Sequence, residues 1–304
     1  MKRVLITGGS GFIGAWIVKR LAARGIEARI FDINPSRATV AEIAGEKLAR
    51  DLDWRIGDIR SGDEVADAIK GCDGVIHMAG VLTPQCQANP VRGAEINLIG
   101  TLNVFEAAKK QGFASVVYAS SAGVFGPDDA THPRPTTLYG AFKLAGEGAA
   151  RAYWADHKLA SFGFRPFVVY GPGRLGGLSA GPTLAARAAA WGEPYVHQFT
   201  GSSGLTYVDD VAEAFERALT LPAAGAGVYN LIGTVATVDE VLAEIRRNVP
   251  AAQLSQSGPP LPIAPGVNEE GLDDLLPGRQ KTSLAAGIAA TIEHYRHHRV
   301  APAA

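Results

Sequence analysis

The chain has 304 residues, which is enough for one large or two smaller domains with a substantial buried core. Hydrophobic residues make up 47% and charged residues 19%, a balance typical of a globular protein. With 29 basic and 30 acidic residues the formal net charge is -1, so electrostatics gives no reason to expect nucleic acid or an anionic membrane as a partner.

The first half of the chain alternates short apolar runs with longer helical patterns. This alternation implies a parallel sheet covered by helices on both faces. We therefore expect an α/β fold, a Rossmann-type doubly wound parallel sheet of about six or seven strands within residues 1–170. Strands are predicted at 4–7, 27–31, 75–78, 116–119 and 167–170, and helices at 12–24, 64–70, 94–109 and 139–157.

The alternation weakens after Tyr170. Glycine and proline predict a loop at 171–181, followed by helices at 183–191, from about Asp209 and at 282–297, where Ser283 is a possible N-cap. A late strand is expected at 228–232 and an irregular proline-rich stretch at 255–265. We expect parts of 205–235 to rejoin the first domain. Residues 171–204 and 236–304 would then form a smaller substrate-binding domain, with the substrate between the two domains.

The cellular context is indicated by cysteines and apolar runs. Two cysteines, Cys72 and Cys86, favour free thiols in a reducing compartment, and no Cys/His spacing suggests a metal site. No apolar stretch reaches the roughly 20 residues that span a bilayer. The apolar N-terminal run is short and broken by glycines, unlike a secretory signal. We expect a cytoplasmic protein.

Three glycines, Gly8, Gly11 and Gly14, follow the first predicted strand and open the first helix. Glycine is needed where a turn takes positive φ and where backbone approaches a pyrophosphate. The helix N-terminus, with Phe12 and Ile13 inside the turn, then offers free N–H groups to the phosphates. In this strand–turn–helix context the spacing predicts dinucleotide binding.

An acidic residue, Asp32, ends the second predicted strand. A carboxylate there hydrogen-bonds the ribose hydroxyls of the adenosine half and repels a 2′-phosphate, which favours NAD over NADP. Arg37 lies close in sequence and is interpreted as a solvated loop charge; the alternative is that it weakens the preference for NAD over NADP.

The segment YGAFK places Tyr139 and Lys143 four residues apart, on one face of a predicted helix. A phenol ordinarily loses its proton near a pKa of about 10. A neighbouring ammonium and the positive ring of an oxidised nicotinamide both favour the phenolate. Tyr139 is therefore a candidate general acid and base, and Lys143 a candidate ligand of the nicotinamide ribose.

The chain resembles the extended short-chain dehydrogenase/reductase family, which includes nucleotide-sugar epimerases and dehydratases. The motifs that carry the resemblance run in order through most of the chain: TGGSGFIG, GDI at 57–59, HMAG at 77–80, INLIGTLNV, SSAGVFG, YGAFK, FRPFVVYGPG at 164–173 and TYVDDVAEAF at 206–215.

The resemblance implies roles for individual residues. Ser121 would polarise the substrate oxygen, Tyr139 would be the acid and base, and Lys143 its partner. Asp58 and Ile59 would contact the adenine, and Ala79 and Gly80 would line the middle of the cofactor. Asn97 would be either a proton-relay residue or a purely structural one.

Departures from the family pattern narrow the chemistry. Dehydratases of the family carry an Asp–Glu pair after the serine, where this chain has Ala122 and Gly123, so elimination is disfavoured. The diphosphate-binding arginine of nucleotide-sugar relatives corresponds to Ser203, and Arg279 is a weak substitute. A buried diphosphate without a cation is costly. We therefore expect a small sugar, sugar acid, polyol or related hydroxy-carbonyl compound as substrate.

Thr83, Arg174 and His197 are candidate substrate contacts, with a loop or surface role as the alternative for each. Three functions remain open: an NAD-dependent dehydrogenase, an NAD-dependent sugar or nucleotide-sugar epimerase, and a non-catalytic NAD sensor. A homodimer is expected, because the predicted helices at 94–109 and 139–157 carry apolar residues on more than one face. In relatives these helices pair into a four-helix interface.

Overall fold

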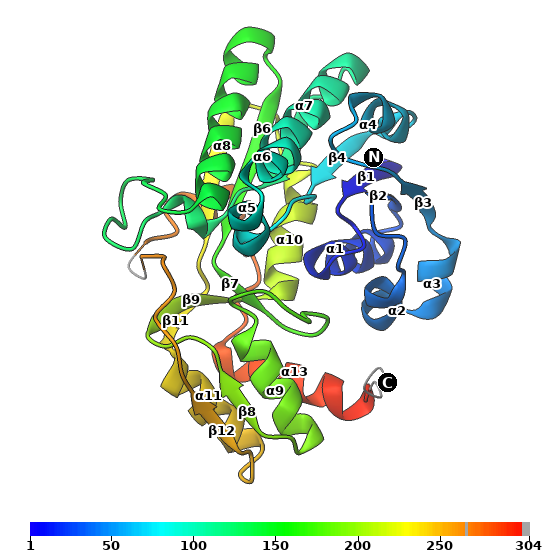
Figure 1. Ribbon diagram of the computed structural model, residues 1–304. Helices are drawn as coiled ribbons and strands as arrows, with labels where there is room; N and C mark the ends of the chain where they lie inside the picture. The colour runs from blue at the N-terminus through cyan, green and yellow to red at the C-terminus, as the bar shows by residue number, and fades with distance from the viewer. Residues whose placement is uncertain (265–266, 300–304) are drawn as a thin grey trace.

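The computed structural model describes residues 1–264 and 267–299, and a seven-stranded sheet forms its centre (Figure 1). All neighbouring strands are parallel, in the order β10-β6-β5-β4-β1-β2-β3. The order in which the strands are added changes direction between β1 and β4: β2 and β3 follow on one side, and β5, β6 and β10 on the other. This change leaves a crevice at the carboxyl ends of β1 and β4. The α/β fold is confirmed. The strands are β1 (Arg3–Thr7), β2 (Glu27–Asp32), β3 (Asp53–Ile56), β4 (Gly74–His77), β5 (Ser115–Ala119), β6 (Ala160–Pro166) and β10 (Ala226–Leu231).

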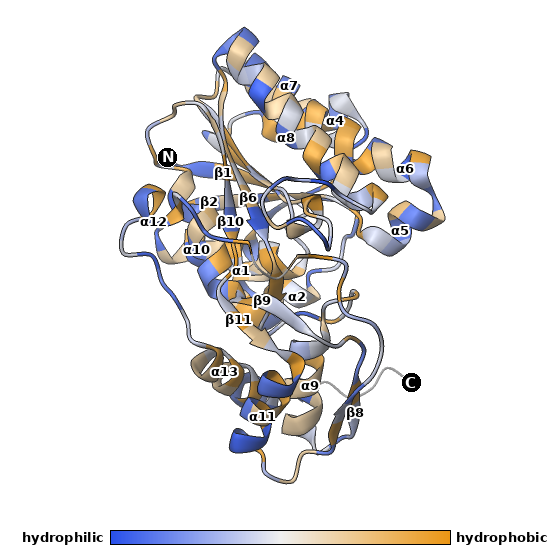
Figure 2. Ribbon diagram, turned by 90° about the vertical axis from the view of Figure 1, so that its left-hand side faces the viewer, coloured by the Kyte–Doolittle hydropathy of each residue, from blue (hydrophilic) through white to orange (hydrophobic). Residues whose placement is uncertain are grey.

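Helices cover both faces of this sheet, as Figure 2 shows. One face carries α1 (Phe12–Ala23), α2 (Ala38–Ala44), α3 (Glu46–Asp51) and α10 (Val208–Ala218). The other face carries α4 (Gly62–Ile69), α7 (Gly100–Gln111) and α8 (Leu138–His157). Before α7 the chain forms α5 (Thr83–Ala88), α6 (Pro90–Ala94) and a π-helical turn, η1 (Glu95–Ile99). The helix expected at 94–109 is thus interrupted by a π turn.

A second group of elements lies at the carboxyl edge of the sheet. It contains a three-stranded sheet of β7 (Val168–Tyr170), β9 (Ser202–Tyr207) and β11 (Thr234–Thr237), and a strand pair of β8 (Tyr195–His197) and β12 (Leu254–Gln256). Its helices are α9 (Gly181–Trp191), α11 (Val238–Asn248), α13 (Leu284–His297) and the short α12 (Leu272–Leu275). Ser283 caps α13 by accepting a hydrogen bond from Ala286 N at 3.2 Å.

The strand expected at 167–170 as part of the parallel sheet requires a correction. The sheet strand is β6, which ends at Pro166, and the next residues form β7 in the three-stranded sheet. The sequence of β6 conceals it because Gly163 and Arg165 interrupt the apolar run. Gly163 is required there, since an added Cβ would lie 2.6 Å from the Tyr118 hydroxyl. β3 was missed for a similar reason: its sequence, DWRI, is half charged.

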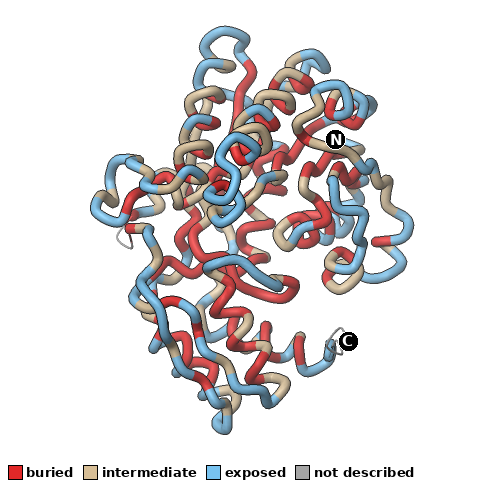
Figure 3. The backbone as a smooth tube through the Cα atoms, in the orientation of Figure 1, coloured by how far each residue is buried: buried red, intermediate tan, exposed pale blue. Residues whose placement is uncertain are grey.

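The two groups of elements share a continuous hydrophobic core, so buried backbone runs from the large sheet into the smaller group (Figure 3). Trp16 of α1 stacks edge-on against Tyr207, with ring centroids 5.9 Å apart, and Tyr207 contacts Tyr170 in the same way at 5.7 Å. The Trp16 indole also donates to Pro172 O at 3.0 Å. These contacts fix the smaller group against the carboxyl edge, while the domain boundaries at 170, 204 and 236 stay a prediction.

Part of the predicted second domain, 300–304 and the pair 265–266, lies outside the described residues. Among the helices that the structure describes, none is both long enough and apolar enough to cross a membrane.

Candidate active site

The predicted cofactor residues follow the carboxyl ends of successive strands. Gly8 follows β1, Asp32 ends β2, Asp58 follows β3, and Ala79 follows β4. Because the strands are parallel, these positions meet at one edge of the sheet. They line a cleft of about 580 Å³, the cofactor cleft, together with Gly11, Phe12, Ile13, Gly14, Ile59 and Gly80.

The glycine turn is tight enough to exclude side chains. Gly8 has φ +70°, and a Cβ there would lie 2.7 Å from Ala79 N. A Cβ at Gly14 would lie 2.7 Å from Gly9 Cα, where helix meets turn. α1 begins after Gly11 without a side-chain cap, so its first N–H groups face the cleft. The turn and helix end therefore fit the diphosphate of a dinucleotide.

Asp32 faces the same cleft and is held in place by its neighbours. Its Oδ2 accepts hydrogen bonds from Ser10 Oγ at 2.6 Å and Ser10 N at 3.1 Å, and its Oδ1 accepts from Asn34 N at 3.0 Å. Arg37 instead donates to Arg50 O at 3.2 Å and lies 5.4 Å from the Trp54 ring. Its guanidinium is thus engaged away from Asp32, outside the lining of the cleft.

The predicted adenine contacts form another part of the cleft wall. The Asp58 carboxylate accepts from Arg60 Nη2 at 2.6 Å, and this partner holds the pKa of Asp58 below its usual range. Asp58 N donates to Glu64 Oε2 at 2.8 Å, which fixes the backbone after β3. Ile59 is buried against Gly100, where an added Cβ would lie 2.9 Å from the isoleucine side chain. Asp58 thus presents a fixed backbone to the cofactor cleft, and Ile59 presents an apolar side chain.

Asn97, in the η1 turn, is buried and fixes the loop that follows β4. Its Oδ1 accepts from Val81 N at 3.2 Å, and its Nδ2 donates to Val81 O at 3.0 Å. A Cβ at Gly80 would lie 2.6 Å from Asn97 Oδ1, so this contact requires glycine. A π turn often marks a functional site, and here it directs Asn97 at the backbone of the cofactor cleft. These bonds give Asn97 a structural role; a proton-relay role stays a prediction.

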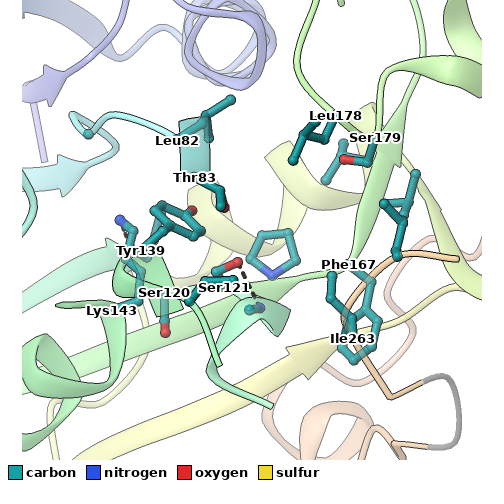
Figure 4. Close-up of a pocket in the computed structure, with 18 of the residues that line it drawn as sticks. Leu82, Thr83, Ser120, Ser121, Tyr139, Lys143, Phe167, Leu178, Ser179 and Ile263 are labelled. Carbon is teal, nitrogen blue, oxygen red and sulfur yellow. Dashed lines mark hydrogen bonds between the residues drawn. The ribbon is translucent and has the colours of Figure 1, made fainter. Parts of the chain in front are cut away.

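The three predicted catalytic residues meet at one point (Figure 4). Tyr139 and Lys143 lie in α8, and Ser121 precedes the 3₁₀ turn η2 (Ala122–Val124). A Cβ at Gly140 would lie 1.9 Å from Gly123 O, so the glycine of YGAFK lets α8 pack directly on η2. This close approach brings Tyr139 beside Ser121.

Hydrogen bonds orient two of these side chains. Ser121 Oγ accepts from Gly123 N at 3.0 Å, so its O–H can donate, as it does to Tyr139. Lys143 Nζ donates to Ala119 O at 2.9 Å. Its position next to the cleft is therefore fixed by the end of β5.

Burial controls the charge of the pair. It raises the pKa of Tyr139, and the hydrogen bond with Ser121 offsets part of that rise. It lowers the pKa of Lys143 to about 8, because the ammonium loses solvation. In the protein alone the proton therefore stays on the phenol. The lowered pKa that the sequence suggested for Tyr139 requires further positive charge, such as that of oxidised nicotinamide.

A second cavity, of about 250 Å³, opens beside the cofactor cleft at the catalytic residues. We call it the inner cavity. Thr83 and Arg174 line it, as expected of substrate contacts, and Arg174 also lines the cofactor cleft. Arg174 donates to Val169 O at 2.5 Å and to Ser179 Oγ at 2.9 Å, and burial lowers its pKa to about 10.

The structure does not bring the third candidate contact, His197, to either cavity of the described chain. Its ring is buried against Gly181 of α9, and its Nδ1 pairs with Phe199 O at 2.9 Å. Ser203 is buried in β9, away from both cavities, and Arg279 is paired with acidic residues of its own segment.

The apolar residues that form the walls of the inner cavity were not predicted from the sequence. They include Leu82, Phe167, Leu178 and Ile263, which come from four separate segments. The sequence offered a signal for Phe167, because this residue lies inside the family motif FRPFVVYGPG. Ile263 belongs to the proline-rich stretch, where no periodicity or motif indicated a function. Within residues 1–264 and 267–299 no three His, Cys, Asp or Glu side chains are grouped as a metal site would require.

A Rossmann-type sheet with a glycine turn, a carboxylate at the end of β2 and a Tyr–Lys pair at one crevice defines a nicotinamide-dependent short-chain dehydrogenase/reductase type of protein. The chain belongs to the NAD dependent epimerase/dehydratase family, whose model matches residues 4–231.

Individual relatives are similar over part of their length. UDP-glucose 4-epimerase 3 of Oryza sativa subsp. japonica is 33% identical over 194 residues, covering 59% of this chain and 52% of that protein. 3-beta-hydroxysteroid dehydrogenase of Mycolicibacterium neoaurum is 33% identical over 185 residues, covering 56% and 48%. The chain thus spans about half the length of these relatives. The crystal structure of Thermus thermophilus UDP-glucose 4-epimerase with NAD is 28% identical, with a TM-score of 0.81 over 97% of this chain and 99% of that one.

Proposed function

We propose that this chain is an NAD-dependent oxidoreductase that transfers a hydride between nicotinamide and a hydroxyl- or carbonyl-bearing carbon of a small molecule. The observation that carries the proposal is the meeting of Ser121, Tyr139 and Lys143 where the inner cavity opens into the cofactor cleft. Small sugars, sugar acids, polyols and related hydroxy-carbonyl compounds are the substrate classes expected from the sequence.

The protein's part in the reaction is to bind, orient and move a proton. NAD would be held by the glycine turn and Asp32, and when bound it supplies the hydride acceptor or donor. The Ser121 hydroxyl, which is hydrogen-bonded to Tyr139, would hold the substrate oxygen, and the Tyr139 hydroxyl would exchange the proton with that oxygen. A protonated Lys143 favours the phenolate of Tyr139 through its charge.

A second candidate is an NAD-dependent epimerase, which the names of two similar proteins favour. It would use the same three residues to oxidise a sugar or nucleotide-sugar carbon and then reduce it from the opposite face. No net reduction of NAD would then accumulate. Apart from Lys143, the inner cavity of the described chain has only Arg174 as a cation for a diphosphate, which favours the dehydrogenase.

The test is a screen of small alcohols, sugars, sugar acids and aldehydes with NAD and NADP, followed by absorbance of reduced nicotinamide. A dehydrogenase gives net absorbance change that Tyr139→Phe abolishes. An epimerase gives no change in absorbance but an altered sugar by chromatography or NMR. A protein that binds NAD but supports neither reaction, on any compound of the panel, contradicts the proposal in favour of a sensor.

Two further features are proposed with the function. The assembly is a homodimer formed through α7 and α8, supported by half-buried apolar side chains such as Leu102, Phe142 and Trp154 on these helices. The compartment is the cytoplasm, supported by Cys72 and Cys86, which are both buried as free thiols.

A further inference from the structure

Most residues that line the inner cavity away from the catalytic residues are apolar, and the polar ones there are Thr83, Thr137, Arg174 and Ser179. Leu82 and Pro84 come from the start of α5, Phe167 follows β6, Leu178 lies in the loop after β7, and Ile263 comes from the stretch after β12. In Figure 4 Phe167 and Ile263 lie together on one side of the cavity and Leu178 on another. Residues from four distant segments thus build one apolar lining.

The mouth of this cavity is apolar as well. Leu82 is 44% exposed and Leu178 is 57% exposed, although both line the cavity. Leu175, in the same loop as Leu178, lines the neighbouring cofactor cleft and is 60% exposed. Leucines left in water around the entrance of a cavity are typical of a binding site for an apolar ligand.

Polar groups in the cavity are few, and those nearest the catalytic residues are engaged. Ser120 Oγ donates to Glu147 Oε1 at 2.5 Å, and the buried Glu147 carboxylate is paired with Arg165. Lys143 donates to Ala119 O. Ser121 and Tyr139 are placed for the reacting oxygen, and Thr83, Thr137 and Ser179 add three further hydroxyl groups to the lining. No Asp, Glu, Asn, Gln or His of the described residues lines this cavity.

The positively charged Arg174 lies where the inner cavity meets the cofactor cleft. Its guanidinium lies 5.8 Å from the ring of Phe12, at the first turn of α1. It lines both cavities, and its terminal nitrogens hold Val169 O and Ser179 Oγ. The far end of the inner cavity, at Phe167 and Ile263, is therefore uncharged.

A substrate with more hydroxyl groups than this small polar set can bond would leave the others without partners in such a cavity. Each buried hydroxyl that loses water and gains no hydrogen bond weakens binding. An apolar ring or chain would instead gain from leaving water. The volume of about 250 Å³ lies below the range of about 300–1,000 Å³ usual for drug-sized ligands, which limits the substrate to a compact molecule.

We propose that the substrate is an uncharged secondary alcohol, or the corresponding ketone, with a compact apolar body that Leu178, Phe167 and Ile263 enclose. This inference rests on the proposed function. Oxidation breaks the carbinol C–H and O–H bonds and forms the C=O bond; the hydride passes to oxidised NAD as co-reactant and the proton to Tyr139 in its phenolate form, which becomes the neutral phenol. Reduction of the ketone by reduced NAD reverses each of these changes.

The first test compares cyclohexanol with myo-inositol, which share one carbocycle and differ only in added hydroxyl groups, using NAD and absorbance of reduced nicotinamide. Indanol extends the apolar arm, and galactose, glucuronate and UDP-glucose extend the polar arm. A hydrophobic pocket rejects one added hydroxyl by about 10²-fold, so kcat/KM for cyclohexanol or indanol should exceed that for inositol by at least about that factor. Net turnover of the polar arm alone overturns the substrate class and leaves hydride transfer intact.

A second measurement covers the case in which no probe is turned over. Indanone and inositol are titrated by calorimetry into the complex of the protein with reduced NAD. Binding of indanone but not of inositol supports the apolar site, whereas binding of inositol alone, or of neither, overturns it. Failure of the protein to bind NAD in the same instrument would instead contradict the proposed function.

The wall itself is tested with Ile263→Asn and a matched control, Val196→Asn. Val196 is 45% exposed in β8 and lies outside both cavities. Ile263→Asn should raise KM or the dissociation constant for the apolar ligand by about tenfold or more, with NAD affinity unchanged. Val196→Asn should change neither quantity. Equal behaviour of the two variants overturns the assignment of this wall.

Discussion

The ammonium of Lys143 donates a hydrogen bond to the backbone carbonyl of Ala119, across 2.9 Å. This bond joins α8 to the end of β5 and sets the lysine at the junction of the two cavities. Burial at that position lowers the pKa of Lys143 to about 8. The protein therefore holds a lysine whose charge can change close to neutral pH.

NAD affinity is predicted to depend on this charge. Protonated Lys143 is a donor for a ribose hydroxyl, and in the protein alone it loses its proton as pH rises through about 8. The dissociation constant for NAD, measured by calorimetry, should therefore rise from about pH 7 to about pH 9. Lys143→Ala should weaken binding at the lower pH and remove the dependence, and Lys143→Arg should keep binding strong at the higher pH. An unchanged profile in Lys143→Ala would contradict the assignment.

Tyr139→Phe is predicted to abolish turnover while leaving the fold intact. The substitution removes only the hydroxyl, and general acid–base catalysis contributes about 10²–10⁴-fold, so kcat should fall by that range. Ser121→Ala should cost less, because the proton path remains. Melting temperature and NAD affinity serve as controls for both variants. Near-native turnover by Tyr139→Phe on the true substrate would show that another group moves the proton.

Asp32→Ala is predicted to relax the preference for NAD over NADP. The carboxylate that Ser10 and Asn34 hold in the cleft would no longer repel the 2′-phosphate. The ratio of kcat/KM values for the two cofactors measures the change. Arg37→Ala is the control and should leave the ratio unchanged, because Arg37 is engaged with Arg50 and Trp54. Tighter binding of NADP than of NAD by the native protein would refute the role of Asp32.

His77 is predicted to make the protein less stable in acid. His77 is buried between Thr7 and Thr101, and this burial lowers its pKa to about 3. Below about pH 6.5 His77 is therefore protonated in the unfolded chain but stays neutral in the folded protein. The free energy of unfolding should fall by about 1.4 kcal/mol per pH unit between those two values. Urea unfolding at several pH values measures this slope. His77→Asn should flatten it and the same change at exposed His132 should not.

A homodimer is predicted from the outer surface of α7 and α8. Half-buried Leu102 and Phe142 lie on these helices, and Ile99 beside them is 44% exposed. Phe105, in contrast, is fully buried against the sheet and belongs to the core. Light scattering at micromolar concentration should give the dimer mass. Leu102→Glu should give a folded monomer, and Val235→Glu, on β11, should leave the dimer intact. A monomeric native protein would refute the assembly.

The sequence alone determined the chemistry of the cofactor and proton-transfer residues. The glycine turn after β1, Asp32 at the end of β2 and the pair Tyr139–Lys143 all depend on spacing within one element or across one turn. Such spacing fixes geometry before any tertiary contact forms, because a helix places residues four apart on one face and a strand–turn–helix unit has little freedom. These residues could therefore be assigned with the family motifs around them.

Only the tertiary structure decided which side chains line the inner cavity. Phe167, Leu178 and Ile263 meet because β6, the loop after β7 and the proline-rich stretch converge over the crevice, and no local periodicity encodes that meeting. The same holds for His197, whose packing under α9 removes it from the site, and for β6, whose pairing with β5 outweighs its interrupted apolar pattern. Burial and strand pairing depend on partners far away in the chain, which is why the sequence indicated the candidate cofactor and proton-transfer residues and the fold supplied the shape of the cavity beside them.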